Sequence, residues 1–193
     1  MATTWNHKYT VTKFHLTTPS KRRSGIAMPK VLGIVAHDTG NPTSTAWNNV
    51  RYYENSRDTI SASAHLFVDD KTIIECIPAV TGKPEKAWHV LYDVTTDNQA
   101  SVFGDDSNDV AIGVELCYGG QINLHQSYKR YVYTMALICH QYKIDPILRI
   151  WGHYQLDPKR KTDPQTPLKI LHKTIDDLRR DVDNEIKACT IKR

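Results

Sequence analysis

Hydrophobic and polar positions along the chain form two kinds of pattern, short apolar runs and longer stretches with helical spacing. The run at residues 31–37, VLGIVAH, is rich in β-branched residues and is bounded by turn formers, so it predicts a buried strand. Further strands are predicted at residues 65–70 and 72–77, which form a pair with a tight turn, at 109–118, and at 148–152.

Apolar residues recur at helical spacing in three other segments. A helix is predicted from about residue 45, a second over residues 127–143 and a third over residues 166–187. Residues 79–108 show no clear periodicity and predict a long loop over one face, a kind of loop that is usually functional or disordered. Because strands alternate with helices, the chain is predicted to form an α/β domain with a mixed central sheet flanked by helices.

Composition is that of an ordinary globular domain. The chain has 193 residues, 40% of them hydrophobic and 24% charged, and a formal net charge of +4. The excess positive charge is interspersed with 21 acidic residues, which is too weak a signal to predict nucleic-acid binding. No apolar stretch approaches the roughly 20 residues of a membrane span. The N-terminus lacks the pattern of a signal peptide, so we expect synthesis in the cytoplasm.

Cysteine usage adds no chemistry of its own. The four cysteines are scattered, without a CxxC pair or a disulfide-framework spacing. Three of them lie within apolar runs, so we interpret them as small buried hydrophobic residues.

Residues 152–164, GHYQLDPKRKTDP, contain the most informative polar residues. His153 and Asp163 are ten residues apart and can meet only if the intervening loop folds back. His37 and His65, like His153, lie at the ends of predicted strands, where α/β sheets build sites. A single histidine in that position is more often a hydrogen-bonded structural residue. Two of the three histidines together with Asp163 would provide the three ligands of a hydrolytic zinc with an open fourth position.

Two further charged residues have alternative interpretations. Glu115 is the only charge in the run VAIGVELCY. It is either a solvent-facing or salt-bridged residue, or a general base whose pKa is raised by burial. Lys161 is either a solvated loop charge or a cation that faces the same cavity as Asp163, because residues i and i+2 of an extended loop point to the same side. In that position its ammonium would stabilise an oxyanion.

Five motifs together resemble one family. IVAHDTG, SAHLFVDD, AWHV, GVEL and the GH…KxDP segment occur in the order found in zinc-dependent N-acetylmuramoyl-L-alanine amidases of the amidase-2 type, which are related to peptidoglycan recognition proteins and common in phage endolysins. The resemblance covers about residues 25–170. It implies a single domain with the fold of that family, in which His37, His153 and Asp163 bind Zn²⁺, Glu115 transfers protons and Lys161 assists.

The resemblance also assigns residues outside the zinc set. Trp88 and His89 match a loop that lines the substrate groove of the family, and His65 matches a position that we interpret as packing. The sequence departs from the family at Gln165, where a glycine usually follows the final Asp-Pro. No ligand position is missing, which argues against a relative that only recognises peptidoglycan.

The implied function is hydrolysis of the amide bond between N-acetylmuramic acid and L-alanine in bacterial peptidoglycan, as in cell-wall lysis. A cytoplasmic amidase that recycles soluble muropeptides and a non-catalytic peptidoglycan-binding module are the alternatives; a zinc peptidase is disfavoured because HExxH is absent. We expect a monomer that binds neither nucleic acid nor membrane and reaches the wall through a holin or by lysis. Residues 1–24 are predicted to form an N-terminal arm, 25–187 the catalytic domain, and 188–193 a tail that starts a linker to a wall-binding domain.

Overall fold

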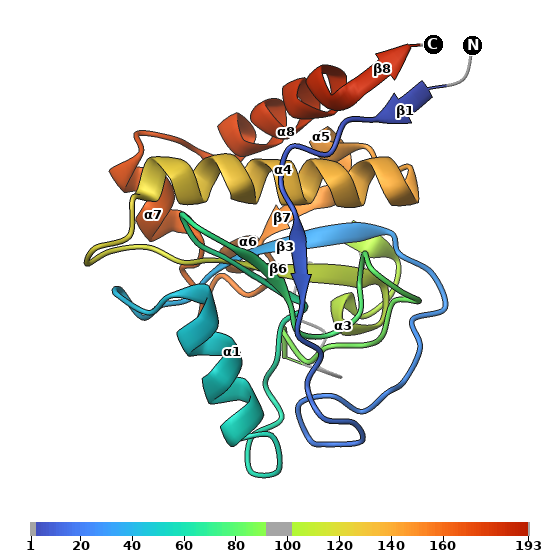
Figure 1. The fold of residues 1–193 in the computed structure, drawn as a ribbon, viewed down its shortest axis with the longest axis vertical. Coiled ribbons are helices and arrows are strands. Elements are labelled where there is room, and N and C mark those ends of the chain that lie inside the picture. The colour runs from blue at the N-terminus through green and yellow to red at the C-terminus, as the bar shows by residue number, and fades with distance from the viewer. Residues whose placement is uncertain (1–2, 92–101, 193) are drawn as a thin grey trace.

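The computed structural model describes residues 3–91 and 102–192, which contain a mixed six-stranded sheet (Figure 1). Its strands are β2 (Val11–Lys13), β3 (Gly33–Asp38), β4 (Leu66–Val68), β5 (Ile73–Glu75), β6 (Ala111–Leu116) and β7 (Ile150–Gly152). They are ordered β2-β5-β4-β6-β3-β7. Strands β4, β6, β3 and β7 are parallel, whereas β5 is antiparallel to β4. The predicted mixed sheet and the predicted strand pair are therefore confirmed.

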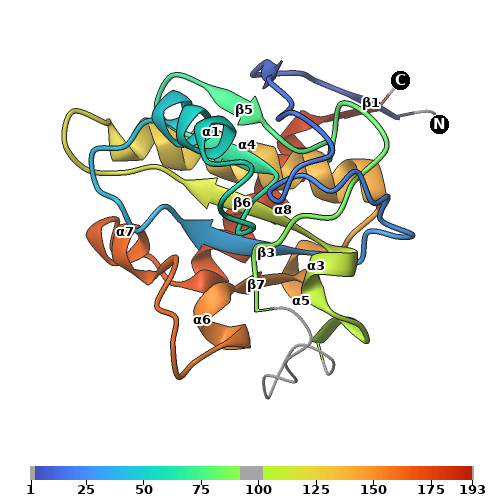
Figure 2. The same cartoon turned by 90° about the horizontal axis from the view of Figure 1, so that it is seen from below.

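Helices lie on both faces of this sheet. They are α1 (Ala46–Asn55), α3 (Ser107–Val110), α4 (Leu124–Tyr142), α5 (Pro146–Arg149), α6 (His153–Leu156), α7 (Gln165–Ile170) and α8 (Ile175–Cys189). Figures 1 and 2 show α4 and α8 together on one face and α1 on the other. The larger hydrophobic cluster joins the sheet to α4 and α8, and a smaller one joins it to α1. This arrangement confirms the predicted α/β class.

The pleat of β3 decides which of its side chains face the site. Ile34 and Ala36 belong to the cluster under α4 and α8, whereas Val35 packs in a separate cluster on the opposite face. Since side chains alternate along a strand, His37 lies on the same face as Val35, away from α4. The sheet thereby directs His37 to the side on which α1 and the long loops lie.

The two ends of the chain pair with each other. Strand β1 (Thr3–Trp5) is antiparallel to β8 (Thr190–Lys192), so the predicted arm and tail form a small second sheet. The arm also contributes β2 to the edge of the main sheet, and its Arg22 is buried with the guanidinium carbon 4.0 Å from the centre of the Tyr53 ring. The arm is thus packed onto the domain, and the linker role of residues 188–193 stays a prediction.

The predicted helix over residues 166–187 is wrong, because the structure has two helices there. Helix α7 ends at Ile170, and His172 adopts a left-handed backbone conformation with φ 54°. Thr174 and Asp177 then form a capping box that starts α8 afresh. Two local signals therefore interrupt a continuous apolar pattern.

Two other segments differ from the predictions. The predicted strand at residues 148–152 begins only at Ile150, because Asp145 caps helix α5 and Pro146 occupies its first turn. The predicted loop at residues 79–108 ends in helix α3, which Asp106 caps, while residues 92–101 lie outside the described residues.

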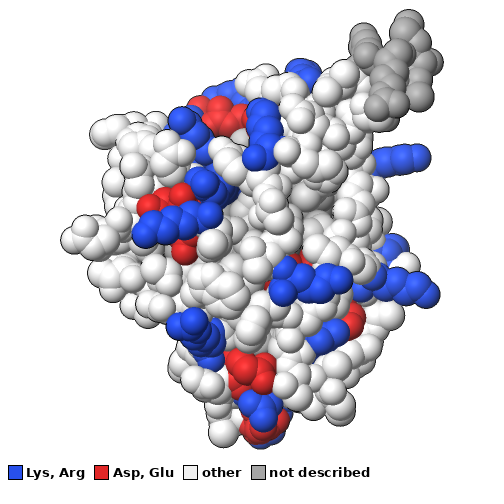
Figure 3. Space-filling model, in the orientation of Figure 1, with Lys and Arg blue, Asp and Glu red and all other residues white. Residues whose placement is uncertain are grey.

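The distribution of charged side chains on the surface is in line with the modest net charge. Acidic and basic side chains lie next to each other at several places on the face shown in Figure 3. Within the described residues, no helix has both the length and the apolar character needed to cross a membrane.

Candidate metal centre and catalytic cavity

Three adjacent strands of the sheet bring the predicted site residues together. His37 at the end of β3 is the direct partner of Glu115 in the parallel β3–β6 register. Strand β7 lies on the other side of β3, and His153 follows it as the first residue of α6. The side chains of His37 and Glu115 share one face because partners in a sheet point the same way. Sequence positions more than a hundred residues apart therefore meet at one edge.

The loop after α6 returns Asp163 to this edge. The backbone N–H of Lys161 donates to Asp157 O at 3.0 Å, and the N–H of Tyr154 donates to Asp163 O at 3.0 Å. These bonds fold residues 153–163 back on themselves, as the spacing of His153 and Asp163 predicts. Gln165 is the first residue of α7, a position that accepts a side chain, so the absent family glycine leaves this loop intact.

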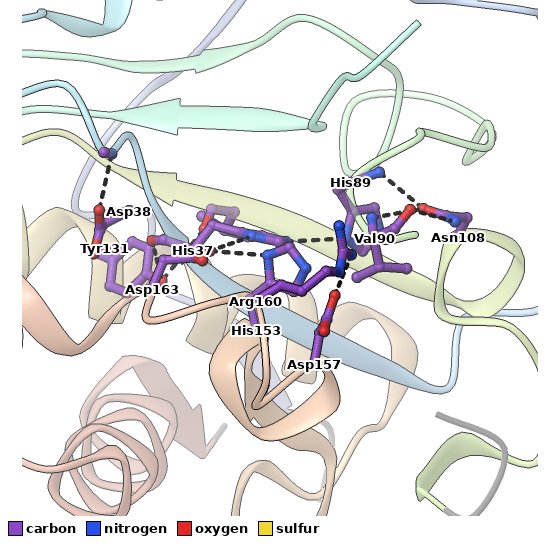
Figure 4. A network of polar contacts seen from close by, with 12 residues as sticks. His37, Asp38, His89, Val90, Asn108, Tyr131, His153, Asp157, Arg160 and Asp163 are labelled. Atoms are coloured by element: carbon purple, nitrogen blue, oxygen red, sulfur yellow. Dashed lines mark hydrogen bonds and ion pairs between the residues drawn. The ribbon is translucent and has the colours of Figure 1, made fainter. Parts of the chain in front are cut away.

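The two predicted histidine ligands both approach one carboxylate oxygen of the third predicted ligand, Asp163 (Figure 4). Asp163 Oδ2 lies 2.8 Å from His37 Nδ1 and 3.1 Å from His153 Nδ1. One donor atom from each of the three residues lies within 4.8 Å of the others. Nε2 of His153 is buried and makes no hydrogen bond with any described residue. Two imidazoles and a carboxylate at this spacing fit a three-ligand zinc.

Burial and the neighbouring charges set the protonation of these ligands. Burial lowers the pKa of His37 to about 4, against the opposing effect of Asp163, so its ring is neutral at pH 7. Burial disfavours the charged form of Asp163, but hydrogen bonds from His153 and His37 outweigh it and hold the pKa of Asp163 well below its usual range. A neutral imidazole and an ionised carboxylate are the forms that bind a metal.

Glu115 faces the same cavity as the ligands. Its Oε2 is buried and makes no hydrogen bond with any described residue. Burial raises the pKa of Glu115 well above its ordinary value, and the negative charges of Asp163 and Asp38 raise it further. Lys161 and Asp163 both line this cavity, which has a volume of about 290 Å³. The chemistry available here is proton transfer by a buried carboxyl beside a cation.

The two remaining predicted site residues, Trp88 and His89, have different surroundings. Trp88 lines the cavity, with the ammonium of Lys86 4.4 Å from the centre of its ring. His89 is 8% exposed, and both ring nitrogens contact protein atoms: Nδ1 lies 3.1 Å from His37 Nε2, and Nε2 lies 3.0 Å from Ala111 O. His89 therefore stands behind His37, one of the predicted metal ligands, although its ring also borders the cavity.

His65 lies outside the ligand cluster. Its Nδ1 accepts the N–H of Gly113 at 2.9 Å, and its Nε2 donates to Glu85 O at 2.9 Å. Both ring nitrogens thus serve backbone groups, as expected for a packing residue.

Sequence reasoning missed several residues around the cavity. Asp38 directly follows His37, and this position at a strand end was a usable signal. Burial raises the pKa of Asp38 to about 6. Tyr53 lines the cavity from α1. Tyr131 of α4 donates its hydroxyl to His37 O at 3.0 Å, and nothing in a helical pattern predicts such a bond across a sheet.

A second cavity adjoins the first. Its volume is about 420 Å³, and it shares Thr39, Tyr53 and Glu115 with the ligand cavity. Asn41, Ser44 and Asn49 add amide and hydroxyl groups to its lining. Both cavities therefore have Glu115 in their linings.

Comparisons of sequence show which proteins share this pattern. A family described as N-acetylmuramoyl-L-alanine amidase (Amidase_2) matches residues 27–166. N-acetylmuramoyl-L-alanine amidase BlyA of Bacillus subtilis (strain 168) is 30% identical over 149 residues, which cover 74% of this chain and 39% of BlyA. N-acetylmuramoyl-L-alanine amidase CwlA of the same strain is 34% identical over 106 residues, which cover 51% of this chain and 32% of CwlA. The chain thus spans less than half the length of either relative.

Solved structures share the fold. The catalytic domain of XlyA superimposes with a TM-score of 0.69 at 21% identity, covering 90% of this chain and 99% of that domain. The Staphylococcus aureus hydrolase AmiA, solved in complex with its ligand, gives a TM-score of 0.72 at 22% identity, covering 93% and 85%. At these identities the likeness concerns the fold.

Proposed function

The chain belongs to the Amidase_2 family of N-acetylmuramoyl-L-alanine amidases, and from this premise we propose that it hydrolyses the amide bond between N-acetylmuramic acid and L-alanine in bacterial peptidoglycan. We further propose that one zinc ion, held by His37, His153 and Asp163, serves the reaction. The observation that carries the proposal is the convergence of these three donors beside Glu115, whose Oε2 is buried.

Each residue has a distinct part in the proposed reaction. When bound, zinc supplies a Lewis acid that lowers the pKa of water toward about 7 and polarises the amide carbonyl. Glu115 accepts a proton from the attacking water and returns it to the nitrogen of the leaving L-alanine. The ammonium of Lys161 stabilises the negative charge that develops on the carbonyl oxygen. The raised pKa of Glu115 suits this role, because a group that first takes and then gives a proton works best near the ambient pH.

The shape of the site supports a substrate that extends to both sides of the reacting bond. Glu115 lines both cavities, which offers space for a glycan in one of them and a stem peptide in the other. Trp88 borders the ligand cavity and offers an apolar contact to the substrate. We assign peptidoglycan as the substrate on this basis and on family membership.

The biological setting is a further part of the proposal. We infer wall lysis of the endolysin kind rather than recycling of soluble muropeptides. A non-catalytic binding module is disfavoured, because the chain keeps a full set of zinc donors and the Glu115–Lys161 pair. Relative rates on intact sacculi and on soluble muropeptides distinguish the two catalytic settings, with faster turnover of sacculi expected.

The direct test is identification of the products. Purified peptidoglycan is digested with the zinc-loaded protein, and mass spectrometry is used to look for free lactyl groups on muramic acid and new L-alanine amino termini. Both products should be absent with Asp163→Ala and present with His125→Ala, a substitution at an exposed histidine in the first turn of α4. Cleavage in the glycan strand, or no cleavage by the zinc-loaded protein, contradicts the proposal.

A further inference from the structure

A third histidine stands directly behind the ligand His37. The two rings lie edge to face, with centroids 5.2 Å apart, and His37 Nε2 is 3.1 Å from His89 Nδ1. On its far side, Nε2 of His89 is 3.0 Å from Ala111 O (Figure 4 shows the position of His89 beside His37). The contacts form a chain from a backbone carbonyl of the sheet through His89 to His37.

The carbonyl at one end of this chain fixes the direction of the bonds made by His89. A carbonyl oxygen only accepts, so Nε2 of His89 carries a proton and donates to Ala111 O. In a neutral ring Nδ1 of His89 is then unprotonated, and it accepts from Nε2–H of His37. The opposite order would place the lone pair of His89 Nε2 against the carbonyl oxygen. With its proton on Nε2, His37 has a lone pair on Nδ1 for a metal; when no metal is bound, the ionised Asp163, whose Oδ2 is 2.8 Å from Nδ1, competes for that proton.

We propose that His89 is a positioning residue: when zinc is bound at Nδ1 of His37, His89 accepts the N–H at Nε2 and so orients the His37 ring toward the metal. The inference rests on the proposed zinc site and assigns His89 a role different from substrate contact. Ligating histidines generally donate their other N–H to a carboxylate, a carbonyl or water, and this orients the ring and raises its basicity. Here the imidazole of His89 is the acceptor, and its own bond to the Ala111 carbonyl fixes its orientation.

The surroundings of His89 are built to hold the ring. The backbone N–H groups of His89 and Val90 both donate to Oδ1 of Asn108, at 2.8 and 3.0 Å. The ring packs closely against Gly113 of β6, where a Cβ would lie 2.7 Å from His89 Cγ. A side chain at residue 113 would therefore push the ring away from His37. Asn108 and Gly113 thus fix the backbone and the ring of His89.

Substitutions that keep or remove a single atom test this role. His89→Asn keeps an acceptor oxygen near the place of Nδ1, His89→Gln keeps only a donor near Nε2, and His89→Phe keeps neither. His65 provides the matched control, because it is a buried histidine whose ring centroid is 5.6 Å from that of His89. Both of its ring nitrogens bond to backbone groups away from His37. His65→Phe should reduce stability without a specific effect on zinc.

Two measurements are made on each folded variant. Zinc affinity, by competition with a chromophoric chelator, should fall about 10–100-fold in His89→Phe and His89→Gln and be largely retained in His89→Asn. Proton NMR of the zinc-loaded protein should show the Nε2–H of His37 as a downfield, slowly exchanging signal, which should be lost in His89→Phe and kept in His65→Phe.

Three results would overturn the inference. These are the absence of a protected Nε2–H signal of His37 in the zinc-loaded wild type, equal zinc affinities in His89→Phe and wild type, or equal losses in His89→Phe and His65→Phe. If His89→Phe does not fold, the Nε2–H signal of the zinc-loaded wild type and the contrast of His89→Asn with His89→Gln decide. A wild type that binds no zinc contradicts the proposed function and the role of His89 with it, whereas equal zinc affinities in a zinc-binding wild type and His89→Phe contradict the role of His89 alone.

Discussion

Replacing Glu115 with glutamine should have opposite effects on activity and stability. The substitution keeps the size of the side chain but removes its ability to take a proton. General acid–base help is worth roughly 10²–10⁴-fold, so we expect amide hydrolysis to fall by that factor, or about 3–5 kcal/mol in barrier height. Zinc affinity should be nearly unchanged, because Glu115 is not one of the three proposed ligands.

Stability should rise because the carboxyl is poorly accommodated when charged. Its Oε2 is buried without a described partner, and burial raises its pKa above the ordinary 4.5. In the metal-free protein the folded state then binds more protons than the unfolded state between pH 4.5 and the folded pKa, so wild-type stability falls as pH rises through this window. Glutamine does not titrate, so the advantage of Glu115→Gln should grow with pH. A buried unpaired polar group costs about 1–3 kcal/mol, and each kcal/mol corresponds to about 2–4 °C in Tm for a domain of this size.

Glu75 provides a control of opposite sign. This carboxylate is also buried, but it accepts N–H groups of Val80 and Thr81 at 2.6 and 3.0 Å, and these bonds with those of Thr81 and His15 overcome burial and lower its pKa. Glu75→Gln should therefore lower Tm, with a loss that is largest above the ordinary pKa and shrinks as pH falls. Tm is measured by calorimetry with a chelator from pH 4.5 to 8. Full activity in Glu115→Gln, or a lower Tm than wild type at pH 8, refutes the reasoning.

Four further outcomes follow from the same geometry. Lys161→Met should lower kcat about 10²-fold with little change in KM, whereas Lys161→Arg should keep much of the rate, as steady-state kinetics will show. Gly113→Ala should weaken zinc binding and cost about 1–3 kcal/mol in urea unfolding, because its Cβ meets His89; unchanged values contradict the packing described. Thr174→Ala removes the cap of α8 and should cost about 1 kcal/mol with activity unchanged. Adding zinc at 100 times its Kd to the apo protein should stabilise it by about 2.7 kcal/mol in thermal unfolding, and no shift in Tm argues against a zinc site.

Much of the candidate site could be predicted because its residues lie at strand ends. His37 and His153 each close a short apolar run, and Glu115 is the only charge in another. The motifs also identify the family, and the match over residues 27–166 confirms that resemblance. Which histidines meet Asp163 could not be derived from spacing alone. That depends on the strand order β6-β3-β7, which places His37 between Glu115 and His153.

Local backbone signals that override the apolar pattern, and strands too short to give a pattern, explain the errors in the fold prediction. The apolar positions of α7 and α8 continue one helical pattern, but the left-handed backbone at His172 and the capping box at Thr174 divide it. Strands of three residues, such as β1, β2 and β8, are too short to give a periodic signal, so the pairing of the two chain ends could not be predicted.

The position of His89 was beyond sequence reasoning for a different reason. The AWHV motif matched a groove-lining loop, and this suggested contact with substrate. The hydrogen bonds of the ring depend on the Ala111 carbonyl, on Asn108 and on the space above Gly113, none of which has a signature in the sequence. Long-range polar contacts of this kind are set by tertiary packing.

The central claim is that one zinc ion, held by His37, His153 and Asp163, enables cleavage of the lactyl amide of peptidoglycan. The most direct test is titration of the metal-free protein with zinc while new L-alanine amino termini are counted in purified sacculi. We predict no release without metal, a linear rise, and saturation at one zinc per chain, with no release at any zinc concentration in Asp163→Ala. Release of L-alanine termini by the chelated protein, or zinc-dependent release that survives in Asp163→Ala, would contradict the claim.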